Sequence, residues 1–194
     1  MIAELDLFIR ICIAIIFISS SISKYNTFDK HIGIIEDYKV LPTNWSRVMG
    51  KLDITAEFVV GLLLLVGLFQ FFGGFFAACI LLIYTIAIVI NLLRGRNEIS
   101  CGCGGVLGNH NLSWILVTRN ILLSLICIKV AFNKELLFSL DAILFRNNSL
   151  MVFGYKAWET FFISLLIIIM VLIAKEITNI KKNFSRIISS FKNL

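Results

Sequence analysis

Residues 73–93 read GGFFAACILLIYTIAIVINLL, a stretch without one charged side chain. A helix needs about 20 mostly apolar residues to cross the hydrocarbon core of a bilayer. A soluble fold would have to bury this whole stretch on every side, whereas a membrane offers it an apolar solvent. The stretch therefore predicts a membrane-spanning helix, and the rest of the chain is interpreted outward from it.

The composition of the whole chain supports the same class. Of its 194 residues, 59% are hydrophobic and only 15% are charged, whereas soluble domains have about 45–50% apolar and about 25% charged residues. With one proline and few charges, the chain is neither disordered nor collagen-like. A soluble enzyme of this size could not hide so much apolar surface in one core. We therefore expect a polytopic protein of the cell membrane.

Four more segments are long and apolar enough to cross. We expect an all-α bundle with a four-helix core and a fifth transmembrane helix appended. The first segment is interpreted as a retained helix rather than a signal peptide, because Lys24 and Tyr25 follow its serines instead of a cleavage pattern. Gly73 and Gly74 are expected at a tight corner between the second and third spans. The five expected spans are 5–23, 53–71, 73–93, 112–132 and 157–175.

The segments between the spans carry most of the charge. The pattern in 24–52 predicts an amphipathic surface helix that ends at Leu41–Pro42. The run around Asp141 predicts an interfacial segment within 133–156, and the basic tail 177–194 suits an anionic membrane surface. The net charge of +6 is spread along these connectors. It therefore favours lipid headgroups as the partner and not nucleic acid.

Two of the five cysteines lie outside the spans. Cys101 and Cys103 stand in the sequence SCGCGG between the third and fourth spans, whereas Cys12, Cys79 and Cys127 are expected to act as small apolar residues. A disulfide between residues i and i+2 is strained, and strained exposed disulfides are the labile or catalytic ones. Cys101 and Cys103 are therefore the candidate catalytic residues for thiol–disulfide exchange. Two other interpretations stay open: a glycine-rich connector with incidental cysteines, and a metal site, either Zn with His110 and a further ligand or Cu(I) held by the two thiolates.

Two ionisable residues inside the spans are candidate supporting residues. Glu57 and Arg119 both lie a few residues below the membrane face that bears the cysteines. Ionisable residues inside a bilayer are costly and usually paired. We expect a Glu57–Arg119 ion pair that either lowers the pKa of the thiols or locks two helices together. Arg10 and Lys129 are expected to snorkel at the opposite face.

The order of these residues resembles the methylamine utilisation protein MauE family, grouped with DoxX-like redox-associated membrane proteins. The resemblance covers residues 5–132, so we expect a MauE-like domain over 1–132 and an appended segment over 133–194. The family reads Cys-Gly-Cys-Phe-Gly where this chain has Gly104 and Gly105 after Cys103, a change that alters the surface available to a partner. The elements that carry the resemblance are Ser23-Lys24, Asp29, Ile32, Tyr38-x-x-Leu41-Pro42, Glu57 before Gly61, Arg94-Gly95, Cys101-Gly102-Cys103-Gly104 and Arg119-Asn120.

The resemblance implies a function. It implies a multi-pass membrane protein that supports maturation, processing or transport of an exported disulfide-containing protein, which in the methylamine system is the β subunit of methylamine dehydrogenase. A thioredoxin-like partner is implied, and the helical bundle looks similar to that of quinone-linked thiol oxidoreductases. The cofactor stays unknown, with a membrane quinone among the acceptors considered. The alternative is a non-redox assembly or transport factor that docks a client peptide.

The side of the membrane that bears the cysteines is not fixed by the sequence. With five spans, the 24–52 loop, the 94–111 loop and the tail share one face and hold most of the Lys and Arg, which favours the cytoplasm. Disulfide chemistry on exported clients favours the outside, because cytoplasmic thiols are kept reduced. We expect the outside. The chain has no phosphate-binding loop, nucleophile triad or zinc-protease helix, so hydrolytic and ATP-driven functions are disfavoured.

Overall fold

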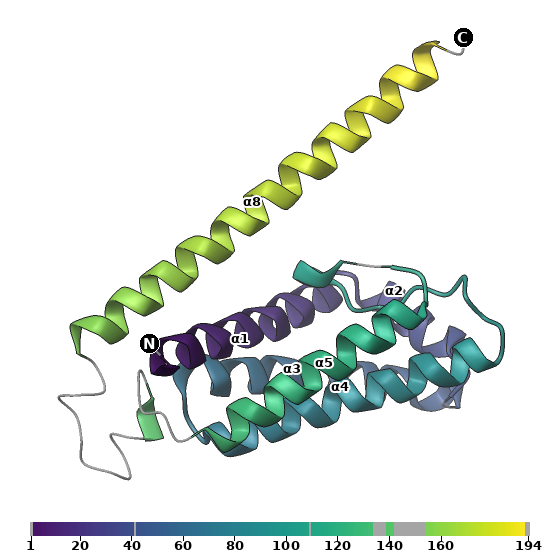
Figure 1. Ribbon diagram of the computed structural model, residues 1–194. Coiled ribbons are helices and arrows are strands. Elements are labelled where there is room, and N and C mark those ends of the chain that lie inside the picture. The colour runs from purple at the N-terminus through teal and green to yellow at the C-terminus, as the bar shows by residue number, and fades with distance from the viewer. Residues whose placement is uncertain (1, 41, 109, 134–138, 142–153, 193–194) are drawn as a thin grey trace.

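The computed structural model describes residues 2–40, 42–108, 110–133, 139–141 and 154–192, and these residues are helical apart from turns and one isolated bridge. The helices are α1 (Ile2–Asn26), α2 (Phe28–Asp37), α3 (Thr43–Val66), α4 (Gln70–Leu93), η1 (Gly105–Leu107), α5 (Trp114–Phe132) and α8 (Tyr155–Lys192). The all-α class is thereby confirmed for the described part of the chain. Figure 1 shows α1, α3, α4 and α5 gathered in one bundle, with α8 diverging from it.

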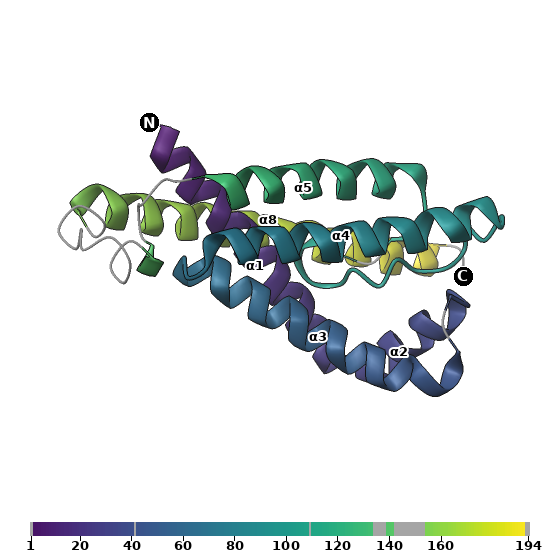
Figure 2. The same ribbon diagram turned by 90° about the horizontal axis from the view of Figure 1, so that it is seen from below.

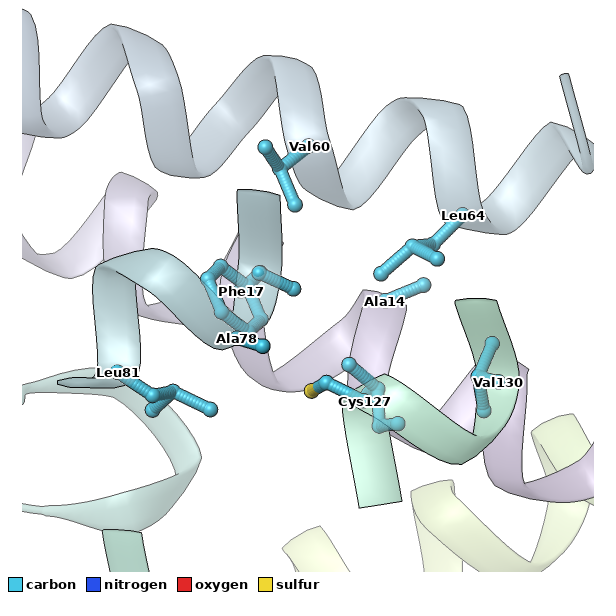
Figure 3. Close-up of a cluster of buried hydrophobic side chains, with 10 residues drawn as sticks. Ala14, Phe17, Val60, Leu64, Ala78, Leu81, Cys127 and Val130 are labelled. Atoms are coloured by element: carbon cyan, nitrogen blue, oxygen red, sulfur yellow. The ribbon is translucent and has the colours of Figure 1, made fainter. Parts of the chain in front are cut away.

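The bundle is built from two pairs of helices. The most extensive packing joins α4 to α5 and α1 to α3, and α3 also packs against α4. Figure 2 shows α4 and α5 running alongside each other while α3 lies on the other side with α2 near its beginning. The central core takes side chains from all four helices of the bundle (Figure 3). They include Ala14 and Phe17 from α1, Val60 and Leu64 from α3, Ala78 and Leu81 from α4, and Cys127 and Val130 from α5.

Three of these helices are long and apolar enough to cross a membrane. They are Ala3–Asn26, Gln70–Leu93 and Trp114–Phe132, found by length and composition among the described residues. They correspond to the expected first, third and fourth spans. Helix α3 is equally long, but Lys51, Asp53 and Glu57 interrupt its apolar character. The expected total of five spans thus remains a proposal.

The corner between α3 and α4 lies earlier than the sequence indicated. Helix α3 ends at Val66, where Gly67 adopts φ 69° and donates its N–H to the Leu63 carbonyl. The prediction of a corner at Gly73 and Gly74 was therefore wrong. Both glycines lie inside α4, and a Cβ on Gly74 would come within 2.8 Å of the Ala131 nitrogen. Their missing side chains serve close helix packing and not a turn.

The described part of the segment expected at the interface caps the start of α4. The Asp141 carboxylate accepts hydrogen bonds from the backbone N–H groups of Phe69 (2.8 Å) and Gln70 (3.0 Å), at the start of α4. Ser139 donates to the Gly67 carbonyl at 2.8 Å. A carboxylate at a helix N-terminus satisfies unpaired N–H groups and complements the helix dipole. The remainder of the expected 133–156 segment, residues 134–138 and 142–153, lies outside the described residues.

The fifth expected span and the basic tail form one helix. Helix α8 runs without a break from Tyr155 to Lys192 and contacts α1, whereas the sequence indicated a span over 157–175 and a separate tail. The helix predicted within 24–52 is found as α2, which ends at Asp37, a few residues before Pro42, and buries His31 and Ile32, while residues 43–52 form the first part of α3. Its position on a membrane surface stays a prediction. Arg10 is buried and bonds Gln70 at 3.3 Å, so it does not snorkel, while Lys129 reaches Asp6 at 3.0 Å with 59% of its side chain exposed.

Candidate functional site

The cysteines lie in a loop that is pinned at its base. We call residues 99–112, which join α4 to α5, the cysteine loop. Its two ends pair in antiparallel fashion: the Leu112 N–H donates to the Ile99 carbonyl (2.9 Å) and the Cys101 N–H to the His110 carbonyl (2.8 Å). The loop therefore closes on itself at the end of the bundle where α4 stops and α5 begins.

The loop is also docked on α1. Ser20 donates its hydroxyl to the Cys103 carbonyl at 2.7 Å, and the Val106 N–H donates to the Ser19 hydroxyl at 3.2 Å. Gly105 has φ 54°, and a Cβ there would lie 2.6 Å from the Ser19 carbonyl carbon. Only glycine combines that backbone angle with so close an approach. The serines at the end of the first apolar segment thus hold the cysteine loop against the bundle.

The two thiols occupy different surroundings. Cys101 is half-buried and Cys103 is buried, and both are free thiols. The Cys103 N–H donates to the Cys101 sulfur at 3.3 Å, and Arg119 Nη2 lies 3.4 Å from the Cys103 sulfur. The Cys101 carbonyl accepts the Tyr38 hydroxyl at 3.3 Å. The pair therefore sits between a guanidinium group on α5 and a phenol just after α2.

This geometry separates the acidities of the two thiols. A hydrogen bond from the Cys103 side chain, backbone hydrogen bonds and the Arg119 charge outweigh burial and lower the pKa of Cys101 to about 5. Hydrogen bonding to Cys101 and burial raise the pKa of Cys103 far above its usual value. At neutral pH the pair therefore holds one proton, with Cys101 as the thiolate and Cys103 as the thiol.

A cluster of charged and polar side chains lies beneath the cysteine loop. We call Lys24, His31, Asp53, Glu57 and Tyr84 the buried charge cluster. Lys24 Nζ lies 2.9 Å from both Asp53 Oδ2 and Glu57 Oε1, and His31 Nε2 lies 3.0 Å from Asp53 Oδ2. The Tyr84 hydroxyl contacts both carboxylates and accepts from Lys24 at 2.8 Å. Four helices (α1, α2, α3 and α4) thus meet at one ionic centre.

The expected Glu57–Arg119 ion pair is not formed. In the described residues Glu57 pairs with Lys24 instead, and Arg119 contacts Cys103 and the Asn120 side chain. The prediction was wrong about which groups face each other across the helices. Lys24, at the end of α1, faces α3, whereas Arg119 faces the cysteine loop. The hypothesis that a cation lowers the pKa of the thiols stays a prediction. Arg119 is the cation that lies beside them.

Sequence reasoning missed Lys24, His31, Asp53 and Tyr84 as site residues. Tyr84 is the one hydroxyl-bearing aromatic residue in the apolar stretch 73–93, and Asp53 stands one turn before Glu57. A carboxylate such as Asp53 is rare in a segment expected to span a membrane, which is a usable signal. His31 and Lys24 belong to the charged connector and carried no such signal. The described residues hold no group of three or more His, Cys, Asp or Glu placed to bind a metal ion.

Comparison with known proteins places the chain in a family. The family profile described as methylamine utilisation protein MauE matches residues 2–132. The chain belongs to this family. The resemblance inferred from the motifs is therefore confirmed, and the buried charge cluster, the cysteine loop and Arg119 all lie inside the matched region.

Curated MauE proteins are similar over the same region. The methylamine utilization protein MauE of Paracoccus denitrificans is 32% identical over 123 residues, which is 63% of this chain and 66% of that protein. The Paracoccus versutus protein is 28% identical with the same coverage, and the Methylorubrum extorquens protein is 26% identical over 125 residues, 64% of this chain and 67% of that protein. The match thus spans about two thirds of these MauE proteins. No solved structure matches the chain.

Proposed function

We propose that this MauE-family chain is a multi-pass protein of the plasma membrane that supports maturation of an exported disulfide-containing protein by thiol–disulfide exchange at Cys101 and Cys103. In this proposal α1, α3, α4 and α5 form a four-helix membrane core within residues 1–132, and residues 133–194 append a fifth crossing. Pairing of Lys24 with Asp53 and Glu57 makes α3 acceptable inside the bilayer. The name of its relatives suggests a client within methylamine utilisation, and a thioredoxin-like protein is a suitable partner.

One observation carries the proposal: the half-buried Cys101 and the buried Cys103 contact each other, and the Arg119 guanidinium lies 3.4 Å from the Cys103 sulfur. A thiolate is the nucleophile in exchange, and a nearby cation favours it. Cys101 attacks a sulfur of a partner disulfide, the partner's other sulfur leaves as a thiolate, and a mixed disulfide forms. Cys103 then attacks the Cys101 sulfur, which releases the partner as a dithiol and leaves a Cys101–Cys103 disulfide. Client oxidation is the same sequence reversed.

The pair is tested with oxidised glutathione as the probe. The purified, reduced chain is expected to pass through an adduct at Cys101 to an internal disulfide, detected by mass spectrometry of alkylated peptides. Cys103→Ser should stop at the Cys101 adduct. Cys101→Ser should react at least tenfold more slowly, because its remaining thiol is buried and protonated. Cys79→Ser, which removes a cysteine of α4 outside the loop, is the matched control and should behave as the unmodified chain.

Two results would contradict the proposal. Equal reactivity of Cys101 and Cys103 would show that the pair is not a nucleophile with a resolving thiol. The second result is client maturation in the host that is undiminished after both cysteines are replaced by serine. Client docking without redox chemistry would then be the function.

A further inference from the structure

A cavity of about 500 Å³ is lined both by the cysteine loop and by residues of the buried charge cluster. Its walls come from α2, α3 and α4, and Cys101, Gly102 and Cys103 close one side of it. Most of the lining is apolar, including Ile34, Leu52 and Ile83. Pockets of roughly 300–1,000 Å³ with apolar walls and a few polar groups are typical of small-molecule and cofactor sites.

The cavity borders the surface that a bilayer would cover. Ile83 belongs to α4, one of the three helices able to cross a membrane, and it is 63% exposed. Leu52, on the facing helix α3, is 55% exposed. These two residues line the cavity and also reach the outside of the bundle. A ligand dissolved in the membrane could therefore enter from the side without passing through water.

One wall of the cavity carries groups that can hold and move protons. Lys24, His31, Asp53 and Tyr84 all contribute to the lining. His31 bonds Asp53 through Nε2, while its buried Nδ1 has no hydrogen-bond partner among the described residues. A Cβ on Gly102 would lie 3.9 Å from that Nδ1, so the imidazole faces the cysteine loop. The histidine thus stands between the thiol pair and the carboxylates.

We propose that this cavity binds the ring of a lipid-soluble quinone and that the quinone is the electron acceptor of the Cys101–Cys103 pair. This inference rests on the proposed function. Three features of the cavity specify the class of ligand: apolar walls open toward the bilayer, thiols at one side, and proton-carrying groups at another. A lipid acyl chain has no polar atoms that could form hydrogen bonds with the buried charge cluster. A peptide has a polar backbone and would not enter through an apolar side opening.

The reaction is balanced by the two thiols and one quinone. Cys101, as the thiolate, and Cys103, as the thiol, lose two electrons and one proton and form one disulfide, while the quinone gains the two electrons, that proton and a second proton taken up from water, and becomes a quinol. Hydrogen-bond donors such as the Tyr84 hydroxyl and Lys24 ammonium can contact a quinone carbonyl oxygen. His31 can pass a proton from the thiol side to the Asp53 side. The pair, once oxidised, then accepts electrons from a client dithiol.

The test uses the full chain in phospholipid nanodiscs, reduced and kept anaerobic, with decylubiquinone as the probe. We expect one quinol, followed by absorbance, for each Cys101–Cys103 disulfide, followed by alkylation. Ala87→Phe and Ala56→Phe place a ring in the cavity lining and should slow this oxidation at least tenfold. Ala56 is exposed, so its variant tolerates the added ring. Ala174→Phe, the same change at an exposed position on α8, should leave the rate unchanged.

Oxidised glutathione separates the two proposals. Cavity variants that react normally with glutathione but slowly with decylubiquinone support the quinone site. Cavity variants that react with both at the unmodified rate overturn it. A chain that is oxidised by glutathione but never by decylubiquinone, even where the quinone binds, also overturns it and leaves thiol exchange standing. A chain that reacts with neither reagent contradicts the proposed function itself.

Discussion

Three basic residues on α1 and α5 have three different kinds of partner. Lys24 balances Asp53 and Glu57 and is only 4% exposed. Arg119 approaches the sulfur of Cys103 instead of a carboxylate. Lys129 forms an exposed pair with Asp6 at the other end of the bundle. These partners determine which pairs of substitutions have non-additive effects on stability, because removing one partner of a buried pair leaves an uncompensated charge.

The pairing of Lys24 with Glu57 can be tested by double substitution. Lys24→Met should lower the free energy of unfolding by about 3–5 kcal/mol, because two carboxylates then lose their cation. Adding Glu57→Gln should recover at least about 1 kcal/mol of that loss. Thermal unfolding in detergent, followed by size-exclusion fluorescence, measures both.

Arg119 supplies the matched comparison. Glu57→Gln should add to Arg119→Leu without rescue, to within about 0.5 kcal/mol, since no hydrogen bond or ion pair joins the two side chains among the described residues. Rescue of Arg119→Leu by Glu57→Gln would show that the two charges meet after all.

The acidity of Cys101 gives a prediction in pH. Because the pKa of Cys101 is lowered to about 5, the thiolate predominates above pH 5 and is lost only as the pH falls through that value. The rate of alkylation of Cys101 should therefore show its inflection near pH 5. Cys103→Ala removes the largest stabilising contact and should move the inflection above pH 7. Peptide mass spectrometry after timed iodoacetamide labelling measures it, and Cys79→Ala should leave the inflection in place.

At the scale of elements, close approach of helices depends on two kinds of glycine. Gly67 ends α3 through its backbone angle, whereas Gly74 lies within α4 and lets α5 come near. Atoms of Ala131 and the Cys127 carbonyl oxygen would all lie 2.8 Å from a Cβ on Gly74. The backbone atoms cannot move aside as a side-chain tip could. The close spacing of α4 and α5 at this point therefore requires a residue without a side chain at position 74.

Alanine substitution distinguishes glycines needed for helix–helix packing from glycines that only lower helix propensity. Gly74→Ala should destabilise the chain by about 1–3 kcal/mol through overpacking. Gly33, inside α2, has nothing within 4 Å of its Cβ position, so Gly33→Ala should be neutral or stabilising by up to about 1 kcal/mol. The two unfolding midpoints should move in opposite directions, and equal shifts would show that α4 and α5 are not in close contact at Gly74.

What the sequence could predict follows from the range of each interaction. Hydropathy is local, so 73–93 and 112–132 were located within a few residues. The Cys-Gly-Cys motif is equally local. Corners and ion pairs depend on neighbours far along the chain: Asp141 caps α4 across some seventy residues, and Lys24 finds Glu57 on another helix. Periodicity gives the depth of such residues but not their angular position around the helix, which is why the Glu57–Arg119 pair was wrong.

For the whole molecule, the distribution of positive charge and the thiol chemistry favour opposite orientations in the membrane. We expect the cysteine loop outside. Two reporter cysteines can test this in a chain whose native cysteines are alanine: His110→Cys, exposed in the loop, and Phe132→Cys, exposed at the far end of α5. A membrane-impermeant maleimide on intact cells should label the first and spare the second. The reverse pattern would place the loop in the cytoplasm.

The continuous helix α8 has a mechanical consequence. Its 38 residues correspond to about 57 Å at 1.5 Å per residue, nearly twice the roughly 30 Å of a bilayer's hydrocarbon core. The helix holds to the bundle through α1, and no turn interrupts it before Lys192. If the helix tilts as a rigid body, a tilt of about 10° at the anchored end displaces the far end by about 10 Å. A small rearrangement beside α1 would then be magnified at the far end of α8.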